Sequence, residues 1–332
     1  MLSQLSFALF IMKLVACVTL SPYLHLSNTN GMNITDMILQ TQIKSLTVAF
    51  ANIDLDEGQL SWGPNFPLEK GLNIINEART IGGKDFQIRL SFGGAVAHSQ
   101  METAFFWTDP TIIQKAYQKV IDLVKPNAID FDIEQKDEWT FDENVVHRRS
   151  QAIAQLRIQN NNIPITFTVS SNHMNGLSPL GKCVVQSAID YGIKFDLNIM
   201  AFDFGYVKQS SIVTKTFQAL DKVKSQVSHF EGKYGIITMI GQTDIPNEYF
   251  LLSDCLPWVT EAKKRSFISL LSFWSLNRDI EFYTTINQKP FEYTKTIQHL
   301  VDTVKVVPLT VDNSCGSVAG FQCPLGLCCS KV

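Results

Sequence analysis

The chain has 332 residues, of which 45% are hydrophobic and 18% are charged, and its formal net charge is −3. This composition excludes a disordered tail protein, a collagen and a coiled coil, and the chain is long enough to bury a sizeable core. The near balance of 28 Lys and Arg against 31 Asp and Glu argues against nucleic acid as the main partner. No run of 18 uninterrupted apolar residues is present and no charge run resembles a membrane-binding patch, so a membrane partner is not expected.

The N-terminus carries a segment that resembles a targeting signal. Residues 5–20 are mostly apolar, Lys13 interrupts them, and Ala16 supplies a small residue near a cleavage point. No basic residue precedes the apolar run, so the signal is imperfect. We expect residues 1–21 to form a signal peptide and the protein to be secreted. A buried N-terminal segment or a misplaced start is the alternative.

Short β-branched or aromatic runs alternate with helical stretches from residue 22 to residue 303. The predicted strands are residues 23–26, 46–51, 86–92, 128–134, 165–170, 197–202, 234–240 and 267–274. Helices are predicted between them, for example at residues 111–124, 143–159, 180–191, 210–227 and 249–264. Eight βα units in one domain of this size predict an α/β fold of the (β/α)8 TIM-barrel type. An open doubly wound sheet is the alternative, which the lack of an opening Gly-rich phosphate turn disfavours.

The strand predicted at residues 128–134 carries three acids at alternate positions, Asp130, Asp132 and Glu134. On a strand these side chains share one face, at roughly 6.5–7 Å per two-residue step. Acids that point into a barrel are costly unless they are paired or protonated, and like charges in a row must separate their pKa values. Such separation assigns acid and base roles. A divalent-metal site and an exposed edge strand are the alternatives, although no further Asp, Glu or His cluster follows the adjacent strands.

Polar residues follow several other predicted strands, where a parallel barrel carries its chemistry. Apart from the three acids, they are Ser91, Asp203, Gln242, Asp244, Arg278 and Asp279. The His residues form no triad-like pattern, and Ser170 and Ser171 have no partner placed to activate them. Catalysis by a serine nucleophile is therefore not predicted.

Four motifs at these positions resemble those of glycoside hydrolase family 18, the chitinases and their relatives. Residues 130–134 (Asp-Phe-Asp-Ile-Glu) resemble the family's Asp-x-Asp-x-Glu, and residues 91–94 (Ser-Phe-Gly-Gly) resemble its Ser-x-Gly-Gly. Residues 198–205 resemble the Met-x-Tyr-Asp block of strand six, and residues 271–279 resemble strand eight of the short bacterial-type chitinases. The motifs occur in the family's order, and the resemblance covers most of residues 22–303.

The resemblance implies a role for each matched residue. Glu134 would be the general acid that protonates the glycosidic oxygen. Asp132 would orient the substrate's 2-acetamido group, whose carbonyl oxygen attacks the anomeric carbon in place of an enzyme nucleophile. Asp130 would share a proton with Asp132, and Asp203 would hydrogen-bond the acetamido group or Asp132. Trp274 would form the floor of the sugar site, and no cofactor or metal is implied. The side chains expected to bind substrate are Met200, Phe202, Trp274, Ser91, Gly93, Gly94, Gln242 and Trp139.

Three departures from the family pattern are visible. The strand-six Tyr is Phe202, which removes a hydroxyl that can bind the acetamido carbonyl and predicts a slower rate. Asn127 and Ala128 replace the usual Asp-Gly, where we expect a packing change only. The short connection between the strands at 234–240 and 267–274 lacks the α+β domain of deep-cleft chitinases, so a shallower groove is expected.

Several aromatic residues follow predicted strands and are candidate platforms for further sugars or ordinary packing residues: Trp62, Trp107, Trp139 and Tyr206. Trp258 falls within a predicted helix and is expected in the core. Aromatic rings suit both roles, because their faces are apolar and wide.

Four of the seven cysteines crowd into the C-terminal tail, at Cys315, Cys323, Cys328 and Cys329. The doublet in a Gly-rich segment predicts an oxidising compartment, and its spacing does not fit a zinc site. Residues 315–332 resemble the first half of a hevein-type chitin-binding module, joined by a linker at residues 304–314. The later cysteines and the stacking aromatics are missing, so this tail is not expected to fold or bind chitin alone. An unrelated disulfide-stapled tail is the alternative.

The sequence therefore predicts a secreted, monomeric chitinase. It would hydrolyse β-1,4-linked N-acetylglucosamine polymers with retention of configuration, with chitin or chitooligosaccharides as its partners. The alternatives are a weak or inactive chitin-binding lectin on the same barrel, an endo-β-N-acetylglucosaminidase and a metal-dependent barrel enzyme.

Overall fold

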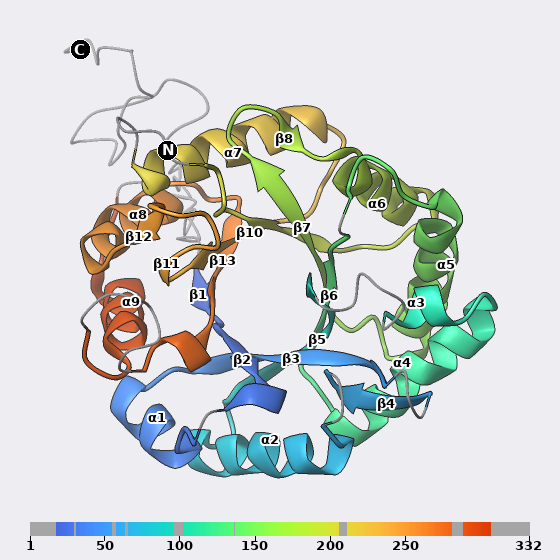
Figure 1. Ribbon diagram of the computed structural model, residues 1–332, viewed down its shortest axis with the longest axis horizontal. Coiled ribbons are helices and arrows are strands. Elements are labelled where there is room, and N and C mark those ends of the chain that lie inside the picture. The colour runs from blue at the N-terminus through green and yellow to red at the C-terminus, as the bar shows by residue number, and fades with distance from the viewer. Residues whose placement is uncertain are drawn as a thin grey trace, which may run out of the picture.

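Parallel strands form the centre of this computed structural model, which describes residues 18–306 except 30, 55–57, 64–65, 96–101, 136, 206–210 and 281–287. In chain order the strands are β1 (Thr19–Leu20), β2 (Tyr23–His25), β3 (Ser45–Asp54), β5 (Gln87–Gly93), β6 (Ala128–Ile133), β7 (Ile165–Asn172), β9 (Asp196–Met200), β10 (Tyr234–Met239) and β13 (Ile268–Trp274). They lie side by side in the order β1-β13-β10-β9-β7-β6-β5-β3-β2. Because β1 and β2 are consecutive in the chain and end this order, the sheet closes into a barrel (Figure 1).

Helices surround the strands in an outer ring (Figure 1). They are α1 (Ile34–Thr41), α2 (Leu68–Gly82), α4 (Pro110–Val124), α5 (Glu143–Gln159), α6 (Pro179–Asp190), α7 (Ile212–Gln226), α8 (Cys255–Lys263) and α9 (Glu292–Thr303). Shorter elements decorate the loops: η1 (Leu26–Asn28), β4 (Gln59–Trp62), α3 (Thr103–Phe106), β8 (Gly176–Leu177), β11 (Gly241–Gln242), β12 (Tyr249–Phe250), η3 (Leu252–Asp254) and η4 (Leu276–Arg278). This arrangement confirms the predicted (β/α)8 barrel, and every predicted strand coincides with an observed one.

The first barrel strand is split in two and begins before the predicted boundary at residue 22. β1 pairs with β13, and Ser21 N donates a hydrogen bond to Leu271 O at 3.0 Å. β2 pairs with β3 on the other side, and Pro22 O accepts from Thr47 N at 2.9 Å. Proline has no N–H for a ladder, which suits it to the point where the strand changes partner. Residues 19–21 therefore belong to the barrel, and a cut after residue 21 would remove part of its first strand.

The segment predicted as one helix over residues 249–264 is divided, which corrects that prediction. Its first two residues form β12, which pairs antiparallel with β11 in the register Gly241↔Phe250. The helix α8 begins only at Cys255, after the 3-10 turn η3. Hairpin pairing with β11, which lies just before it in the chain, overrides the helical pattern here.

Alternation along β6 sorts its residues between two faces. Phe131 packs outward, with its ring 5.5 Å from that of Phe92 and 5.1 Å from that of Tyr117 on α4. Successive side chains of a strand point to opposite faces, so Asp130 and Asp132 point into the barrel. The apolar layer between sheet and helices thus lies outside β6, and the carboxylates lie inside, as predicted.

Some predictions concern segments outside the described residues. These are the signal-like segment up to residue 17, Tyr206 and the C-terminal segment from residue 307 with its four cysteines. Of the cysteines that are described, Cys183 and Cys255 are free thiols. Within the described ranges, no helix combines the length and the apolar character needed to cross a membrane.

A buried ion pair joins helices on the outer ring. Arg149 of α5 donates from Nη2 to Glu102 Oε2 at 2.9 Å, and both side chains are almost fully buried. The Tyr117 hydroxyl of α4 donates to Glu102 Oε1 at 3.0 Å. A buried charge needs such partners, because an unpaired one is strongly destabilising.

Asp279, which the sequence singles out as polar at a strand end, has a structural role. Its carboxylate is fully buried and accepts from the backbone N–H groups of Tyr293 and Thr294, at 3.1 and 2.7 Å. It also accepts from Gln288 Nε2 at 3.1 Å. These contacts satisfy the N–H groups at the start of α9, which lack partners within the helix.

We expect Asp279→Ala to lower the free energy of unfolding by about 2–4 kcal/mol, because it leaves buried donors unsatisfied. Asp109 is the matched control, since it caps α4 with a hydrogen bond from Thr111 N at 2.8 Å but is exposed. Asp109→Ala should cost about 1 kcal/mol. Denaturant unfolding measures both, and equal losses would contradict this account of Asp279.

Candidate active site

A cavity of about 180 Å³ lies at the carboxyl ends of the barrel strands. It combines carboxylates with aromatic and thioether side chains, a mixture suited to a ligand with polar edges and apolar faces. The residues that line it are Tyr23, His25, Phe50, Ala95, Asp132, Glu134, Thr168, Met200, Phe202, Asp203, Ile237, Met239, Asp244 and Trp274. Three of the four predicted catalytic residues line this cavity, namely Asp132, Glu134 and Asp203. The predicted binding residues Met200, Phe202 and Trp274 line it as well.

Asp130 lies beneath the cavity, fully buried, and accepts hydrogen bonds on both oxygens. Oδ2 accepts from the hydroxyls of Tyr23 and Ser91 at 2.9 and 2.7 Å. Oδ1 accepts from side chains of neighbouring strands at 2.6–3.3 Å, namely Thr166, Thr168 and Asn198. Oδ2 thus accepts two hydrogen bonds, one for each of its lone pairs, and the three donors to Oδ1 share its two lone pairs. Asp130 is thus held by four different strands.

Asp132 lies one step further along the same face of β6, at the floor of the cavity. Burial, together with the charges of Glu134, Asp130 and Glu138, raises the pKa of Asp132 well above its usual value. Its Oδ1 atom is buried and has no hydrogen-bond partner among the described residues. That atom is therefore available to a ligand N–H. The predicted proton sharing between Asp130 and Asp132 stays a prediction.

Glu134 follows β6 at the cavity wall and is half-buried. Burial raises its pKa to about 7, and the charges of Glu138, Asp244 and Asp203 add to that shift. A carboxyl group with this pKa is protonated in about half of the molecules at neutral pH. It can therefore deliver that proton to a ligand oxygen in the cavity.

Glu138 is an acidic neighbour of this site that the sequence analysis did not weigh. Ser170 Oγ donates to Glu138 Oε1 at 2.6 Å, which ties the loop after β6 to the end of β7. The sequence feature that could have indicated its role is its position four residues after Glu134, in the same loop. The predicted binding residue Trp139 follows it, with its side chain 75% exposed. Trp139 does not line the main cavity but a neighbouring one, together with Glu138, Ser170, Asn172 and Lys182.

Aromatic rings form one wall of the main cavity. Trp274, at the end of β13, lies nearly parallel to Phe50, with 5.5 Å between ring centroids and an interplanar angle of 16°. The rings of Tyr23 and His25 lie 6.0 and 5.5 Å from that of Trp274. Burial lowers the pKa of His25, which favours its neutral form. The sequence identified Trp274 but not the other three, because they come from strands without a matched motif.

Ser91, Gly93 and Gly94 shape the site but are not among the residues that line the cavity, and their role in substrate binding stays a prediction. Ser91 is fully buried and donates to Asp130. Gly93 has φ +100°, and a Cβ there would lie 2.0 Å from the carbonyl oxygen of Asp132. Gly94 N donates to that same oxygen at 3.0 Å. The motif therefore supports the two aspartates from the neighbouring strand.

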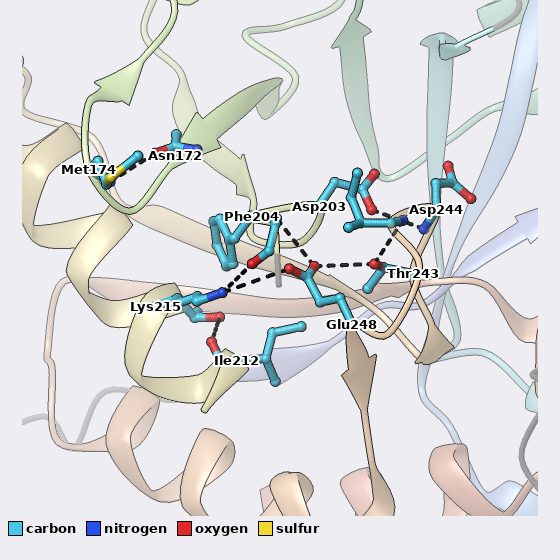
Figure 2. Close-up of polar contacts among 12 residues, drawn as sticks. Asn172, Met174, Asp203, Phe204, Ile212, Lys215, Thr243, Asp244 and Glu248 are labelled. Atoms are coloured by element: carbon cyan, nitrogen blue, oxygen red, sulfur yellow. Dashed lines mark hydrogen bonds and ion pairs between the residues drawn. The ribbon is translucent and has the colours of Figure 1, made fainter. Parts of the chain in front are cut away.

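Asp203 and Asp244 face the cavity from the loops after β9 and β10. Asp203 Oδ1 accepts from Asp244 N at 2.9 Å, as Figure 2 shows. Burial raises the pKa of Asp203, and a hydrogen bond from Thr243 opposes that shift. Gln242 lies on β11 and is not among the residues that line this cavity, and its role in binding stays a prediction.

Of two other candidate platforms, Trp62 belongs to the interior and Trp107 is only partly buried. Trp62 is fully buried, and its Nε1 donates to Leu68 O at 3.1 Å. Trp107 packs against the apolar core and lies edge-on to Phe106. Trp258 is fully buried, which confirms its predicted place in the core. Over the described ranges, no group of three or more His, Cys, Asp or Glu side chains is arranged to hold a metal ion.

No protein-family profile matches the chain. Among curated proteins it is 23% identical over 300 residues to a probable bifunctional chitinase/lysozyme of Escherichia coli, covering 83% of this chain and 32% of that protein. It is 25% identical over 228 residues to Endochitinase 11 of Metarhizium anisopliae, covering 62% and 42% respectively. The chain thus spans less than half the length of either relative.

Solved structures share the fold. The catalytic domain of a hyperthermophilic chitinase from Pyrococcus furiosus superposes with a TM-score of 0.74 at 21% identity, over 88% of this chain and 98% of that one. A family GH18 chitinase from Chromobacterium violaceum gives a TM-score of 0.59 at 13% identity, over 87% and 84%. These likenesses establish the barrel fold.

We expect the Glu134 carboxyl to titrate with a midpoint near 7, against an ordinary value of 4.5. Glu138→Gln should lower this midpoint, because it removes a neighbouring negative charge that opposes ionisation of Glu134. Ser170→Ala is the control, since it removes a hydrogen bond to Glu138 but keeps the charge. Carbon-13 NMR of labelled glutamate carboxyls measures the titration. A wild-type midpoint near the ordinary value would contradict this electrostatic account.

Proposed function

We propose that this chain is a chitinase of the glycoside hydrolase family 18 type. It hydrolyses β-1,4-linked N-acetylglucosamine polymers with retention of configuration, by a substrate-assisted route. One observation carries the proposal. Glu134, whose pKa burial raises to about 7, shares a cavity with the ring of Trp274 and with a buried oxygen of Asp132 that has no partner among the described residues.

The first step divides the chemistry between enzyme and substrate. Asp132 Oδ1 accepts the N–H of the 2-acetamido group and so turns its carbonyl oxygen toward the anomeric carbon. As that oxygen forms its bond to the carbon, the glycosidic C–O bond breaks. Glu134 passes its proton to the departing oxygen and becomes a carboxylate.

The second step reverses these roles. The Glu134 carboxylate takes a proton from a water molecule, whose oxygen attacks the anomeric carbon from the face that the leaving group vacated. The bond to the acetamido oxygen breaks, the acetamido group regains its neutral form, and Glu134 holds its proton again. Two displacements at one carbon retain its configuration.

The aromatic wall supports a sugar as ligand. Pyranose rings present apolar C–H faces that stack on indole, and polar edges that need donors and acceptors. Trp274 supplies the ring, and Asp203 and Asp244 supply acceptors in the same cavity. The similar Pyrococcus furiosus domain has been crystallised, as catalytic-site mutants, with chito-oligosaccharides, which supports the same ligand class here.

A lectin without turnover is the second candidate, and Phe202 is the observation in its favour. Phe202 lines the cavity where the family carries a Tyr, so that position offers no hydroxyl to the acetamido carbonyl. The similar structure of YKL-39 was solved in the presence of chitooligosaccharides, with a TM-score of 0.58. Turnover separates these candidates, since a lectin would bind the oligomer and leave it intact.

We expect Glu134→Gln to slow hydrolysis of an unactivated chitin oligomer by roughly 10²–10⁴-fold, because the amide has no acidic proton to give. Binding should survive, because Asp132, Asp203 and Trp274 remain in place. Product analysis by chromatography measures the rate, and calorimetry measures the affinity.

A glucose oligomer of matched length is the control substrate for the wild-type enzyme. It lacks the acetamido group that acts as nucleophile, so it should not be cut. Near-normal turnover by Glu134→Gln, or comparable cleavage of the glucose oligomer, would contradict the substrate-assisted assignment. Full inhibition by EDTA would instead indicate a metal-dependent enzyme.

We expect Phe202→Tyr to raise kcat, because the added hydroxyl restores a donor toward the acetamido carbonyl. One donor used mainly in the transition state gives at best about 1–3 kcal/mol. Steady-state kinetics on a chitin oligomer measures the gain, and the melting temperature checks the fold. A lower kcat with an unchanged melting temperature would show that the cavity has adapted to Phe202.

A further inference from the structure

A buried ion pair lies behind the cavity wall, and neither step of the proposed reaction uses it. Lys215 of α7 and Glu248 of the β11–β12 hairpin have side chains only 3% and 5% exposed. Their Nζ and Oε2 atoms are 4.0 Å apart (Figure 2). Burying two charges is costly, and at this distance their attraction does not repay the cost as a close hydrogen-bonded pair would. The pair therefore calls for an explanation other than global stability.

The remaining contacts of the pair run to two loops. Glu248 Oε1 accepts from Phe204 N and from Thr243 Oγ1, each at 3.2 Å. Lys215 Nζ donates to the carbonyl oxygen of Gly205 at 2.5 Å. Hydrogen bonds to charged groups are stronger than neutral ones, so helix α7 holds the loop after β9 and the β11–β12 hairpin together.

Those two loops carry the acidic residues that face Glu134. Asp203 directly precedes Phe204, and Asp244 directly follows Thr243, so each acid is adjacent to a residue that Glu248 holds. Asp203 has φ +55°, a left-handed conformation that residues other than glycine seldom adopt. Such a conformation persists when the surroundings hold it, which the contacts to Glu248 and Lys215 do.

We propose that Lys215 and Glu248 are positioning residues that hold Asp203 and Asp244 against Glu134 and the bound sugar. The pair touches neither substrate nor reacting atoms, and it acts through the two loops. This inference rests on the proposed function, because it names what sets the geometry of that site. It extends the machinery of the site to a helix on the outer ring.

Several charged or titratable side chains surround the Lys215–Glu248 pair and the two loops. Glu134 faces Asp203, Asp244 and Glu138. Asp203 faces Asp244 and Glu248, and His173 at the end of β7 faces both Lys215 and Glu248. Displacing the two loops would therefore alter the charge around Glu134 and shift the basic limb of the pH–rate profile. Loss of stability alone would not shift that limb.

The experiment compares Glu248→Gln and the double variant K215M/E248Q with Glu102→Gln. Glu102 belongs to an equally buried ion pair with Arg149 on the outer ring, outside the residues that line the cavity. The double variant leaves no unpaired buried charge, so it should fold even where Glu248→Gln is too unstable. The readouts are kcat and KM on a chitin oligomer, the pH–rate profile, and amide hydrogen exchange without substrate.

We expect the Glu248 variants to lower kcat by at least about tenfold, with a smaller change in KM, because small misplacements of catalytic groups are costly. Their pH–rate profile should shift, and exchange at the Phe204 and Asp244 amides should accelerate. Glu102→Gln should lower the melting temperature but leave kcat, the profile and those two amides unchanged.

Wild-type kcat and exchange in the double variant would overturn the proposal. A fall in kcat with Glu102→Gln as large as with the Glu248 variants would also overturn it, since the effect would then be one of general stability. If the wild type does not cut chitin oligomers but exchange still accelerates as expected, the proposed function fails and the positioning of the two loops stands.

Discussion

Asp130 imposes the strongest constraint on this barrel, because it places a carboxyl with no exposed surface at the centre of the fold. Its hydrogen-bond donors come from β2, β5, β7 and β9, so strands far apart in sequence each give up an apolar interior residue for a polar one. The interior of the barrel is therefore polar along one path. That path leads from Asp130 up to the cavity.

The electrostatic environment changes along β6 in a way that separates the roles of its three acids. Asp130 is saturated with donors, Asp132 has a buried oxygen without a partner, and Glu134 stands among the carboxylates of neighbouring loops. Burial and like charge raise the pKa values of both Asp132 and Glu134. The same alternation of residues thus produces a structural carboxylate, a ligand acceptor and a proton donor.

The site depends on groups well behind the cavity wall. Gly93 at the end of β5 lets the backbone approach Asp132 closely, and a buried pair on α7 and the β11–β12 hairpin holds the loops of Asp203 and Asp244. These supports lie on different strands and helices. They meet only because the barrel brings the carboxyl ends of all its strands together.

The sequence by itself determined the strands, the barrel and the acids of β6, because alternation and spacing along one strand are local properties. It also identified Met200, Phe202, Asp203 and Trp274 at the cavity through their motifs. Only the tertiary structure decided that Ser91 and Gly93 support Asp130 and Asp132, that Tyr23, His25 and Phe50 join the aromatic wall, and that Glu138 acts on Glu134. The physical reason is that hydrogen-bond partners, burial and like-charge neighbours arise between residues distant in sequence, and no local pattern records them.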